Sequence, residues 1–266
     1  MAGKRGLIMG VANDHSIAWG IARAAASQGA ELAFTYQAES FARRVRPLAE
    51  AVGSDLMLDC DVSDAASLDR AVDARGAAWA RLDFIVHAIA YSDKEELKGR
   101  YVDTTQANFL HTMNISCYSF TAVAQRAARL MTNGGAMVTL SYHGAQQVMP
   151  NYNVMGVAKA ALEASVRYLA SDLGPDGIRV NAISAGPMRT LAGSAVGSAR
   201  QVYSYNREVA PLRRNVMLDD VGGAGLYLLS DLSAAVTGEV HYVDCGFNTV
   251  GMPVPKPSNN GEAVPE

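Results

Sequence analysis

The sequence predicts a single α/β domain with a doubly wound, seven-stranded parallel sheet flanked by helices on both faces. Short apolar runs recur along the chain, and longer segments with helical periodicity separate them. Continuous apolar runs are typical of parallel strands, because crossover helices cover both faces of such a sheet. With 266 residues, 49% of them hydrophobic, the chain can bury one large core, and two small domains are the less favoured division.

The expected strands are the apolar runs at residues 7–9, 31–36, 55–58, 83–86, 136–140, 179–183 and 239–243. The expected helices are the periodic segments at residues 17–28, 41–52, 65–80, 104–131, 154–173 and 219–230. Right-handed crossovers between these strands place ligands beyond the carboxyl ends of the sheet. We expect the folded domain to cover residues 1–252, and the Pro-rich, polar segment 253–266 to be a disordered tail.

Composition narrows the class of protein. The net charge of −3 gives no sign of a nucleic-acid partner. No apolar run reaches the roughly 18 residues that a membrane-spanning helix needs, and the chain starts without a signal-peptide pattern. We therefore expect a soluble, cytoplasmic protein that is not bound to a membrane.

Cysteine and histidine spacings predict neither disulfides nor a metal site. Three cysteines stand far apart and form no CxxC pair: Cys60, Cys117 and Cys245. This pattern is typical of thiols in a reducing compartment. Four of the five histidines also form no metal-ligand spacing: His15, His111, His143 and His241.

The first strand runs into the segment GVANDHSIAWGIA, which contains Gly10, Ser16 and Gly20. A glycine at the strand end permits a tight turn, and a small residue at the helix entry lets backbone N–H groups approach a pyrophosphate. The spacing is not GxGxxG, and a generic turn between strand and helix is the alternative. Its place after the first strand of an alternating α/β chain favours dinucleotide binding.

The ends of the second and third strands bear on the choice of dinucleotide. Gln37 stands where a dinucleotide-binding fold often offers Asp or Glu to the adenosine ribose, while Arg43 and Arg44 come several residues later. A 2′-phosphate would favour a cation directly after the strand, so NADH is preferred over NADPH. Asp61 could accept a hydrogen bond from the adenine amino group, although capping of the next helix is an equally good interpretation.

The fourth and sixth strands also end in candidate ligand-binding segments. His87 lies within an apolar run, which favours a hydrogen-bonded core histidine over an acid or base. After the sixth strand, Gly186 and Pro187 turn the chain, and Thr190 could bind a nicotinamide carboxamide or a phosphate. The following segment, up to about residue 209, is rich in small residues before it becomes helical, as in a mobile lid.

The segment 139–159 carries the candidate chemistry. Tyr142 and Tyr152 stand near Lys159, and the last two are seven positions apart, which on a helix is two turns or about 10 Å along one face. A tyrosine hydroxyl beside an ammonium is a plausible donor to a carbonyl oxygen that gains charge during a reaction. A surface Tyr and a surface Lys on an ordinary helix remain the alternative for the pair alone.

Four motifs together resemble one family. They are Gly10-x5-Ser16-x3-Gly20, SYHGAQQVMPNYNVMGVAKA, RVNAISAGPMRTLA and GEVHYVDCGF, and they run in order through residues 4 to about 252. The set is similar to the bacterial enoyl-acyl carrier protein reductases of the FabI type, which are divergent, Rossmann-type members of the short-chain dehydrogenase/reductase superfamily. Ordinary members use Tyr-x3-Lys, whereas this branch uses Tyr-x6-Lys, the spacing found here.

The resemblance implies NADH-dependent reduction of the trans-2 double bond of an acyl thioester, the last step of each elongation cycle in type II fatty acid synthesis. Hydride goes to the β carbon and leaves an enolate on the thioester oxygen. It implies that Tyr152 donates a hydrogen bond to that oxygen, that Lys159 holds the nicotinamide ribose, and that Tyr142 lines the pocket. Ser92, Tyr142 and Tyr152 would contact the substrate.

The resemblance also implies a set of cofactor contacts, a lid and partners. The expected cofactor-binding residues are Gly10, Ser16, Ile17, Gln37, Asp61, Val62, Ile89, Lys159, Met188, Thr190, Leu191 and Ala192. The lid would cover about residues 191–209. The implied partners are an enoyl substrate on the acyl carrier protein and further copies of the chain in a homotetramer.

Some positions depart from the usual pattern of that family. Ala90 and Cys245 stand where glycine is usual, which puts the geometry of the turn at Cys245 in doubt. His143 replaces a common apolar residue and receives no role. Within residues 197–201 only Arg200 is basic, so docking of the acidic carrier could be weaker or differently placed.

Two other functions stay open. The first is a short-chain reductase that acts on a ketone or another enone. The second is a non-catalytic, dinucleotide-binding sensor on the same fold. The presence of Tyr142, Tyr152 and Lys159 together speaks against a sensor, which has no need of the pair.

Overall fold

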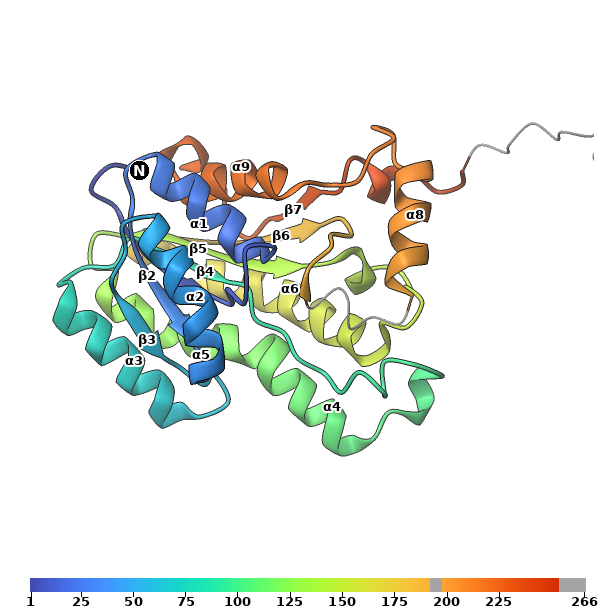
Figure 1. Ribbon diagram of the computed structural model, residues 1–266, viewed down its shortest axis with the longest axis horizontal. Helices are drawn as coiled ribbons and strands as arrows, with labels where there is room; N and C mark the ends of the chain where they lie inside the picture. Colours follow the sequence, from blue (N-terminus) through green and yellow to red (C-terminus); the bar gives the residue numbers. More distant parts are fainter. Residues whose placement is uncertain (192–197, 254–266) are drawn as a thin grey trace, which may run out of the picture.

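The computed structural model describes residues 1–191 and 198–253. Within these residues seven strands form one sheet in the order β3-β2-β1-β4-β5-β6-β7, and all the neighbouring pairs are parallel. The predicted doubly wound sheet is therefore confirmed (Figure 1). The strands are β1 (Arg5–Met9), β2 (Glu31–Tyr36), β3 (Met57–Asp59), β4 (Phe84–His87), β5 (Gly135–Ser141), β6 (Ile178–Ala185) and β7 (Val240–Val243).

Helices cover both faces of the sheet. They are α1 (Ile17–Ser27), α2 (Glu39–Ala51), α3 (Ala65–Ala78), α4 (Gln106–Met113), α5 (Ser119–Ala127), α6 (Asn153–Leu173), α8 (Ala199–Val209) and α9 (Leu218–Leu229). Figure 1 shows α1 and α9 on one side of the sheet and α3, α5 and α6 on the other. This layering follows from the apolar runs, because each strand has apolar side chains on both faces and both faces must be covered by helices.

The core is divided by the sheet in the way that strand alternation requires. In β5, Ala136, Val138 and Leu140 are buried in the cluster that includes residues of α1, α2 and α9. Met137 is buried in the cluster on the other face, with residues of α3, α5 and α6. Alternate side chains of a strand point to opposite faces, so the consecutive apolar residues 136–138 serve both cores.

The single helix expected over 104–131 is wrong. α4 begins at Gln106, because the Thr105 side chain caps it by accepting from the Asn108 N–H at 3.2 Å. A π-helical turn, Asn114–Tyr118, then separates α4 from α5. In this turn the Ser116 hydroxyl donates to the Tyr91 carbonyl at 2.9 Å, and the Tyr91 N–H donates to the hydroxyl at 2.9 Å. Side-chain bonds to the loop after β4 thus accompany the local departure from α-helical spacing.

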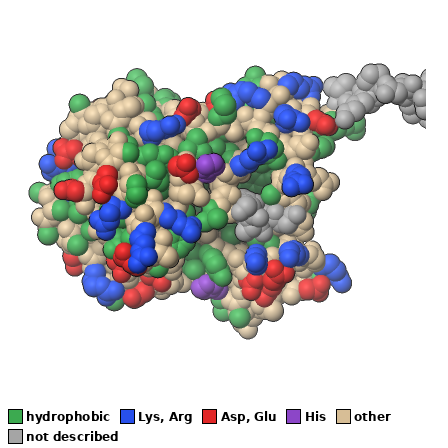
Figure 2. Space-filling model, in the orientation of Figure 1, with side chains coloured by type: hydrophobic (Ala, Val, Ile, Leu, Met, Phe, Trp, Pro, Cys, Tyr) green, Lys and Arg blue, Asp and Glu red, His purple; other side chains and the backbone are tan. Residues whose placement is uncertain are grey.

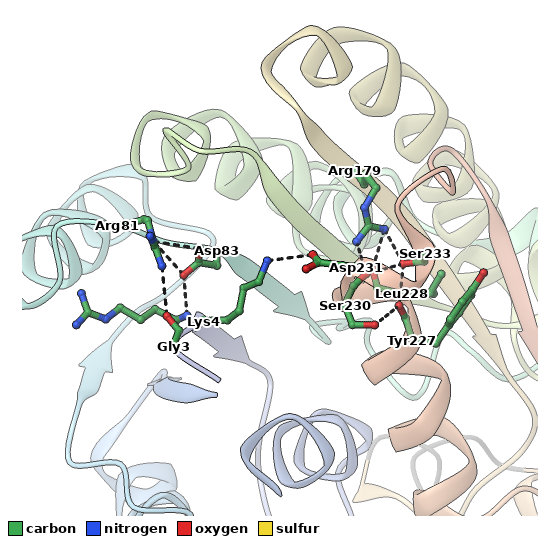
Figure 3. Close-up of polar contacts among 11 residues, drawn as sticks. Gly3, Lys4, Arg81, Asp83, Arg179, Tyr227, Leu228, Ser230, Asp231 and Ser233 are labelled. Carbon is green, nitrogen blue, oxygen red and sulfur yellow. Dashed lines mark hydrogen bonds and ion pairs between the residues drawn. The ribbon is translucent and has the colours of Figure 1, made fainter. Parts of the chain in front are cut away.

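The amino-end edge of the sheet is held by polar contacts (Figure 3). The Arg179 guanidinium donates to the Leu228 and Ser230 carbonyls, at 2.9 and 3.0 Å, and so binds the last carbonyls of α9. Such carbonyls lack partners within their own helix, and a cation there is favoured by the helix dipole. Nearby, Lys4 pairs with an exposed Asp231 at 3.1 Å, which contributes little to stability. This edge therefore has a structural role.

The surface charges, the helix lengths and the placement of potential metal ligands bear on nucleic acid, membranes and metals as partners. Side chains of both charges are interspersed on the face in Figure 2, without a continuous basic stripe. None of the helices in the described part of the chain combines the length and apolarity needed to cross a membrane. In the same residues, no group of three or more His, Cys, Asp or Glu side chains is placed to hold a metal ion.

Candidate active site

The turn after β1 lies where the strand order reverses, between β1 and β4. Gly10 has φ +95°, and a Cβ at this position would stand 2.1 Å from the Ala88 carbonyl oxygen. The buried Ser16 hydroxyl accepts from the Ala12 and Asn13 N–H groups, at 3.0 and 3.1 Å. Only glycine permits this approach of two backbones, and the serine fixes the loop that follows. Ile17 then begins α1. The turn is of the kind expected for a dinucleotide site.

Gln37 and Asp61 meet at the ends of β2 and β3. The Gln37 amide donates to Asp61 Oδ2 at 3.1 Å, and Ser63 donates to Oδ1 through its N–H and its hydroxyl, at 2.9 and 2.7 Å. Partial burial opposes the effect, but these hydrogen bonds hold the pKa of Asp61 below its usual value. The interpretation of Asp61 as a helix cap is wrong, because Asp64 caps α3.

The remaining expected cofactor residues follow other strands of the sheet. Val62 and Ile89 come after β3 and β4 and pack, partly buried, against the core on the α3, α5 and α6 side. Met188 packs against the other core, and its carbonyl accepts from the Thr190 N–H at 3.0 Å. Leu191 is exposed. Ala192 lies outside the residues that the structure describes.

The two tyrosines are brought together at the carboxyl end of β5. Tyr142 directly follows β5, and Tyr152 is the N-cap residue of α6, so Tyr152 precedes the helix instead of lying within it. Their ring centroids are 5.0 Å apart at 74°, an edge-to-face contact. Burial raises the pKa of Tyr142 to about 12, and it raises that of Tyr152 further, with help from Tyr142 and Glu163. Both hydroxyls therefore keep their protons at neutral pH and can donate hydrogen bonds.

Two asparagines that the sequence interpretation missed fix the position of Tyr152. Asn151 and Asn153 flank it in the left-handed region, with φ of 57° and 37°. Asn153 also donates from its side chain to the Gly99 carbonyl at 3.3 Å. Asparagine tolerates this conformation better than most residues, so the sequence Asn-Tyr-Asn after a proline was the available signal.

Lys159 is buried in the second turn of α6. It is 6% exposed, and its ammonium donates to the Leu140 carbonyl of β5 at 2.7 Å. Burial lowers the pKa of Lys159 to about 8, while Cys117 and Glu163 act in the opposite direction. The surface Tyr–Lys pair is thus excluded, since Lys159 is buried and Tyr152 is partly buried against an apolar cluster.

An expected substrate contact, Ser92, is hydrogen-bonded to α4, and an apolar cluster lies against Tyr152. The Ser92 hydroxyl accepts from the Thr112 hydroxyl at 2.9 Å and from the Asn108 amide at 3.2 Å. The cluster has buried members Leu97, Val154 and Met155, with the partly buried Phe109 and Tyr152 against them. Tyr152 therefore contacts an apolar wall. Phe109 of this wall lies in the expected helix 104–131, but Leu97 comes from a segment that carries no such sequence signal.

His87 is a hydrogen-bonded core residue, as predicted. It is fully buried, with Nδ1 3.1 Å from the Thr139 hydroxyl and Nε2 2.9 Å from the Ser119 hydroxyl. Burial, with a smaller effect of Lys159, lowers its pKa to about 3. The imidazole is therefore neutral and links β4, β5 and α5.

The departure at Cys245 leaves the turn in the conformation that glycine favours. Cys245 is buried at φ +61°, and Gly246 follows at φ +86°. The neighbouring His143 ring packs edge-on against Phe247, with centroids 5.6 Å apart. The turn is thus strained, and the cysteine is accommodated within it.

The fold and this site define a class. A glycine turn at the reversal of strand order is suited to a dinucleotide, and a partly buried, neutral tyrosine near a buried lysine is suited to an oxyanion formed by hydride addition. These are the features of a dinucleotide-dependent reductase of the short-chain type.

Comparison with known proteins specifies the family. A family model described as enoyl-(acyl carrier protein) reductase matches residues 10–248. A Rhizobium meliloti protein named enoyl-[acyl-carrier-protein] reductase [NADH] 2 is 65% identical, over 95% of this chain and 94% of its own. The chain belongs to the enoyl-(acyl carrier protein) reductase family, and it is an oxidoreductase by that membership.

Solved structures agree with this assignment. The enoyl reductase of Anaplasma phagocytophilum, in complex with NAD, is 59% identical with a TM-score of 0.91, over 96% of this chain and 95% of its own. The Bacillus cereus enoyl-acyl carrier protein reductase, with NADP⁺ and an indole naphthyridinone, is 47% identical with a TM-score of 0.93, over 94% of this chain and 98% of its own.

Proposed function

We propose that this chain reduces the trans-2 double bond of enoyl thioesters carried on the acyl carrier protein, with NADH, in fatty acid synthesis. One observation carries the proposal. Tyr152 stands at the start of α6 against the Tyr142 ring, with Lys159 buried two turns further along the helix. This is the Tyr-x6-Lys arrangement in three dimensions, with both tyrosines protonated.

The residues at the carboxyl edge of the sheet fit NADH. Gly10 packs its backbone directly against Ala88, and Ser16 is a small residue at the entry of α1, where helical N–H groups can approach a pyrophosphate. At the ribose end, Gln37 is bonded to Asp61, whose carboxylate would repel a 2′-phosphate. This favours NADH over NADPH. The nicotinamide, when bound, supplies the hydride for the β carbon of the substrate.

Tyr152 is proposed to stabilise the developing enolate. Reduction at the β carbon puts negative charge on the thioester oxygen, and a donor already aimed at that oxygen lowers the barrier. Because burial raises the pKa of Tyr152, its hydroxyl stays a neutral donor. The α carbon is protonated afterwards.

Lys159 and the remaining side chains are proposed to bind and orient. The Lys159 ammonium has one bond to the Leu140 carbonyl and further donors for the ribose hydroxyls of the cofactor. Tyr142 and Ser92 would contact the substrate, and the apolar cluster with Leu97 and Met155 would lie along the acyl chain.

Several further parts of the assignment rest on the family. We propose that the chain works in the cytoplasm as a homotetramer, with residues 1–252 as the catalytic domain. The expected tail, residues 253–266, lies outside the described residues after Pro253. The lid expected over about residues 191–209 is proposed to include α8, while its residues 192–197 lie outside the part of the chain that the structure describes. Analytical ultracentrifugation tests the tetramer, and a stable dimer or monomer would refute it.

The activity is tested by the loss of NADH absorbance with trans-2-butenoyl thioester. We expect oxidation of NADH with the enoyl thioester, much slower oxidation with NADPH, and none with a 3-ketoacyl thioester. Turnover of the ketone alone would point to another short-chain reductase. Binding of NADH without consumption in either assay would identify a sensor and reject the enzyme.

A further inference from the structure

Glu163 is a buried carboxylate without a part in the chemistry proposed above. It is 5% exposed and lies on α6, four residues after Lys159, so the two side chains share one face of the helix. A buried carboxylate needs hydrogen-bond partners, because it loses its hydration on folding. The hydrogen-bond partners of Glu163 therefore indicate which part of the structure it stabilises.

The two oxygens of Glu163 bind the two ends of one short turn. The Ser141 hydroxyl donates to Oε1 at 2.5 Å, and the Gln146 amide donates to Oε2 at 3.4 Å. Between these residues lies the 3₁₀ turn η4 (His143–Ala145), which follows the end of β5. Lys159 holds the residue before Ser141, through its 2.7 Å bond to the Leu140 carbonyl. One face of α6 thus fixes the whole connection from β5.

This turn is the surface on which the Tyr152 ring rests. A Cβ on Gly144, at the centre of η4, would stand 2.4 Å from Cδ1 of the Tyr152 ring, so ring and turn are in direct contact. A Cβ on Gly156 would stand 2.7 Å from the Gly144 carbonyl, so the turn also lies close against α6. Tyr142, the residue before η4, makes the edge-to-face contact with Tyr152. A displacement of η4 would therefore move both tyrosines.

We propose that Glu163 is a positioning residue for the reduction, which holds η4 by its bonds to Ser141 and Gln146 and so fixes the ring of Tyr152 relative to the substrate. The proposal rests on the proposed function. Small displacements of a donor matter, because the rate depends on alignment with the reacting oxygen. Both hydrogen bonds that the described structure gives Glu163 go to the ends of the turn, so it acts through the turn.

The test compares Glu163→Ala, Glu163→Gln and Ser141→Ala with the wild-type enzyme. Glu163→Gln keeps an oxygen for the Ser141 hydroxyl, and the exposed Gln146 amide can rotate to meet its NH₂ group. Glu163→Ala removes both bonds, and Ser141→Ala removes the shorter one from the other side. The control is Ser165→Ala on the same helix, which removes a hydroxyl bond to the Ala161 carbonyl and a 3.6 Å contact with Cys117 Sγ but leaves the bonds to Ser141 and Gln146 in place.

We expect Glu163→Ala to lower kcat at least about 10-fold while the Kd for NADH stays within about threefold. Glu163→Gln is expected to restore kcat to within about threefold of wild type, and Ser165→Ala to match wild type. Ser141→Ala should lower kcat in the same direction as Glu163→Ala. The double variant should be no slower than Glu163→Ala, because the two residues act through one bond.

The proposal is overturned by a kcat for Glu163→Ala within twofold of wild type. It is also overturned if Glu163→Gln and Glu163→Ala lower kcat equally. A third contrary outcome is a loss of both kcat and NADH affinity in proportion to the decrease in Tm, which would indicate general destabilisation. If Glu163→Ala does not fold, Ser141→Ala decides, and a normal kcat there refutes the role. A wild-type chain that fails to reduce any enoyl thioester refutes the proposed function itself, which is a separate result.

Discussion

The proposed reaction depends on one hydroxyl group, that of Tyr152, as the hydrogen-bond donor to the enolate. In Tyr152→Phe the ring can keep its contacts with Gly144 and Tyr142, while the donor is lost. Removal of one preorganised oxyanion donor typically lowers kcat by about 10²–10³. We expect a loss of this size in the steady-state assay, with NADH affinity by fluorescence titration unchanged. The control is Tyr168→Phe, at an exposed position of α6, the helix that follows Tyr152. Normal turnover in Tyr152→Phe would contradict the role.

Lys159 is a buried ammonium whose charge depends on pH near neutrality. Its pKa is lowered to about 8, so the lysine is mostly protonated at pH 7 and loses its proton as the pH rises through 8. If the charged form holds the ribose, the Kd for NADH should rise over that interval. Lys159→Met keeps the length of the side chain and removes the charge. It should bind NADH more weakly at pH 7 and show no such pH dependence. An identical pH dependence in the variant would rule out Lys159 as its source.

At the scale of elements, the turn between β1 and α1 depends on close approach as well as on backbone conformation. Gly10 and Gly53 both have positive φ, +95° and +74°, but only at Gly10 would a Cβ overlap another atom, the Ala88 carbonyl oxygen. Gly53→Ala should therefore cost about 1–2 kcal/mol of unfolding free energy, from the left-handed conformation alone. Gly10→Ala adds a steric overlap and should cost on the order of 3 kcal/mol or more.

Urea unfolding measures both free energies, and NADH titration measures the effect on the site. Gly10→Ala should weaken NADH binding, since relief of the overlap displaces the turn from β4. Gly53→Ala should leave the Kd unchanged, because the described structure places no other atom within 4 Å of the added carbon. Equal stability losses in the two variants would show that the approach to Ala88 does not matter.

At the scale of the whole molecule, His87 makes stability sensitive to acid. Its folded-state pKa of about 3 lies below the ordinary value of 6.5, so the unfolded chain takes up the proton first as the pH falls. Stability from this group is complete above pH 6.5 and is lost progressively toward pH 3, at about 1.4 kcal/mol per unit. Between pH 7 and 5 we expect a loss of about 2 kcal/mol from His87.

The measurement is urea unfolding of wild type and His87→Gln at several pH values. The glutamine variant should be less stable at pH 7, because its bonds to Thr139 and Ser119 are altered, but should lose less stability between pH 7 and 5. Carboxylates contribute equally to both proteins. Parallel curves for the two proteins would contradict the prediction.

Much of the fold could be predicted because its signal is local. The apolar runs predict the strands, and the alternation of strands with helices predicts a parallel sheet with helices on both faces. The β2 bounds, Glu31–Tyr36, agree with the predicted range, since apolar residues fill the strand up to a polar turn. The helix over 104–131 was predicted wrongly because its periodicity continues through Asn114–Tyr118, where side-chain bonds to Tyr91 accompany a π turn.

The sequence by itself determined which residues carry the candidate chemistry, because Tyr152 and Lys159 are close in the chain and their spacing is a property of the chain. Only the tertiary structure decided their environment. Tyr152 precedes α6 instead of lying within it, and its ring rests on a turn that Glu163 holds from the helix. Burial, pKa and close approach arise where distant segments meet, and such contacts leave no periodic trace in the sequence.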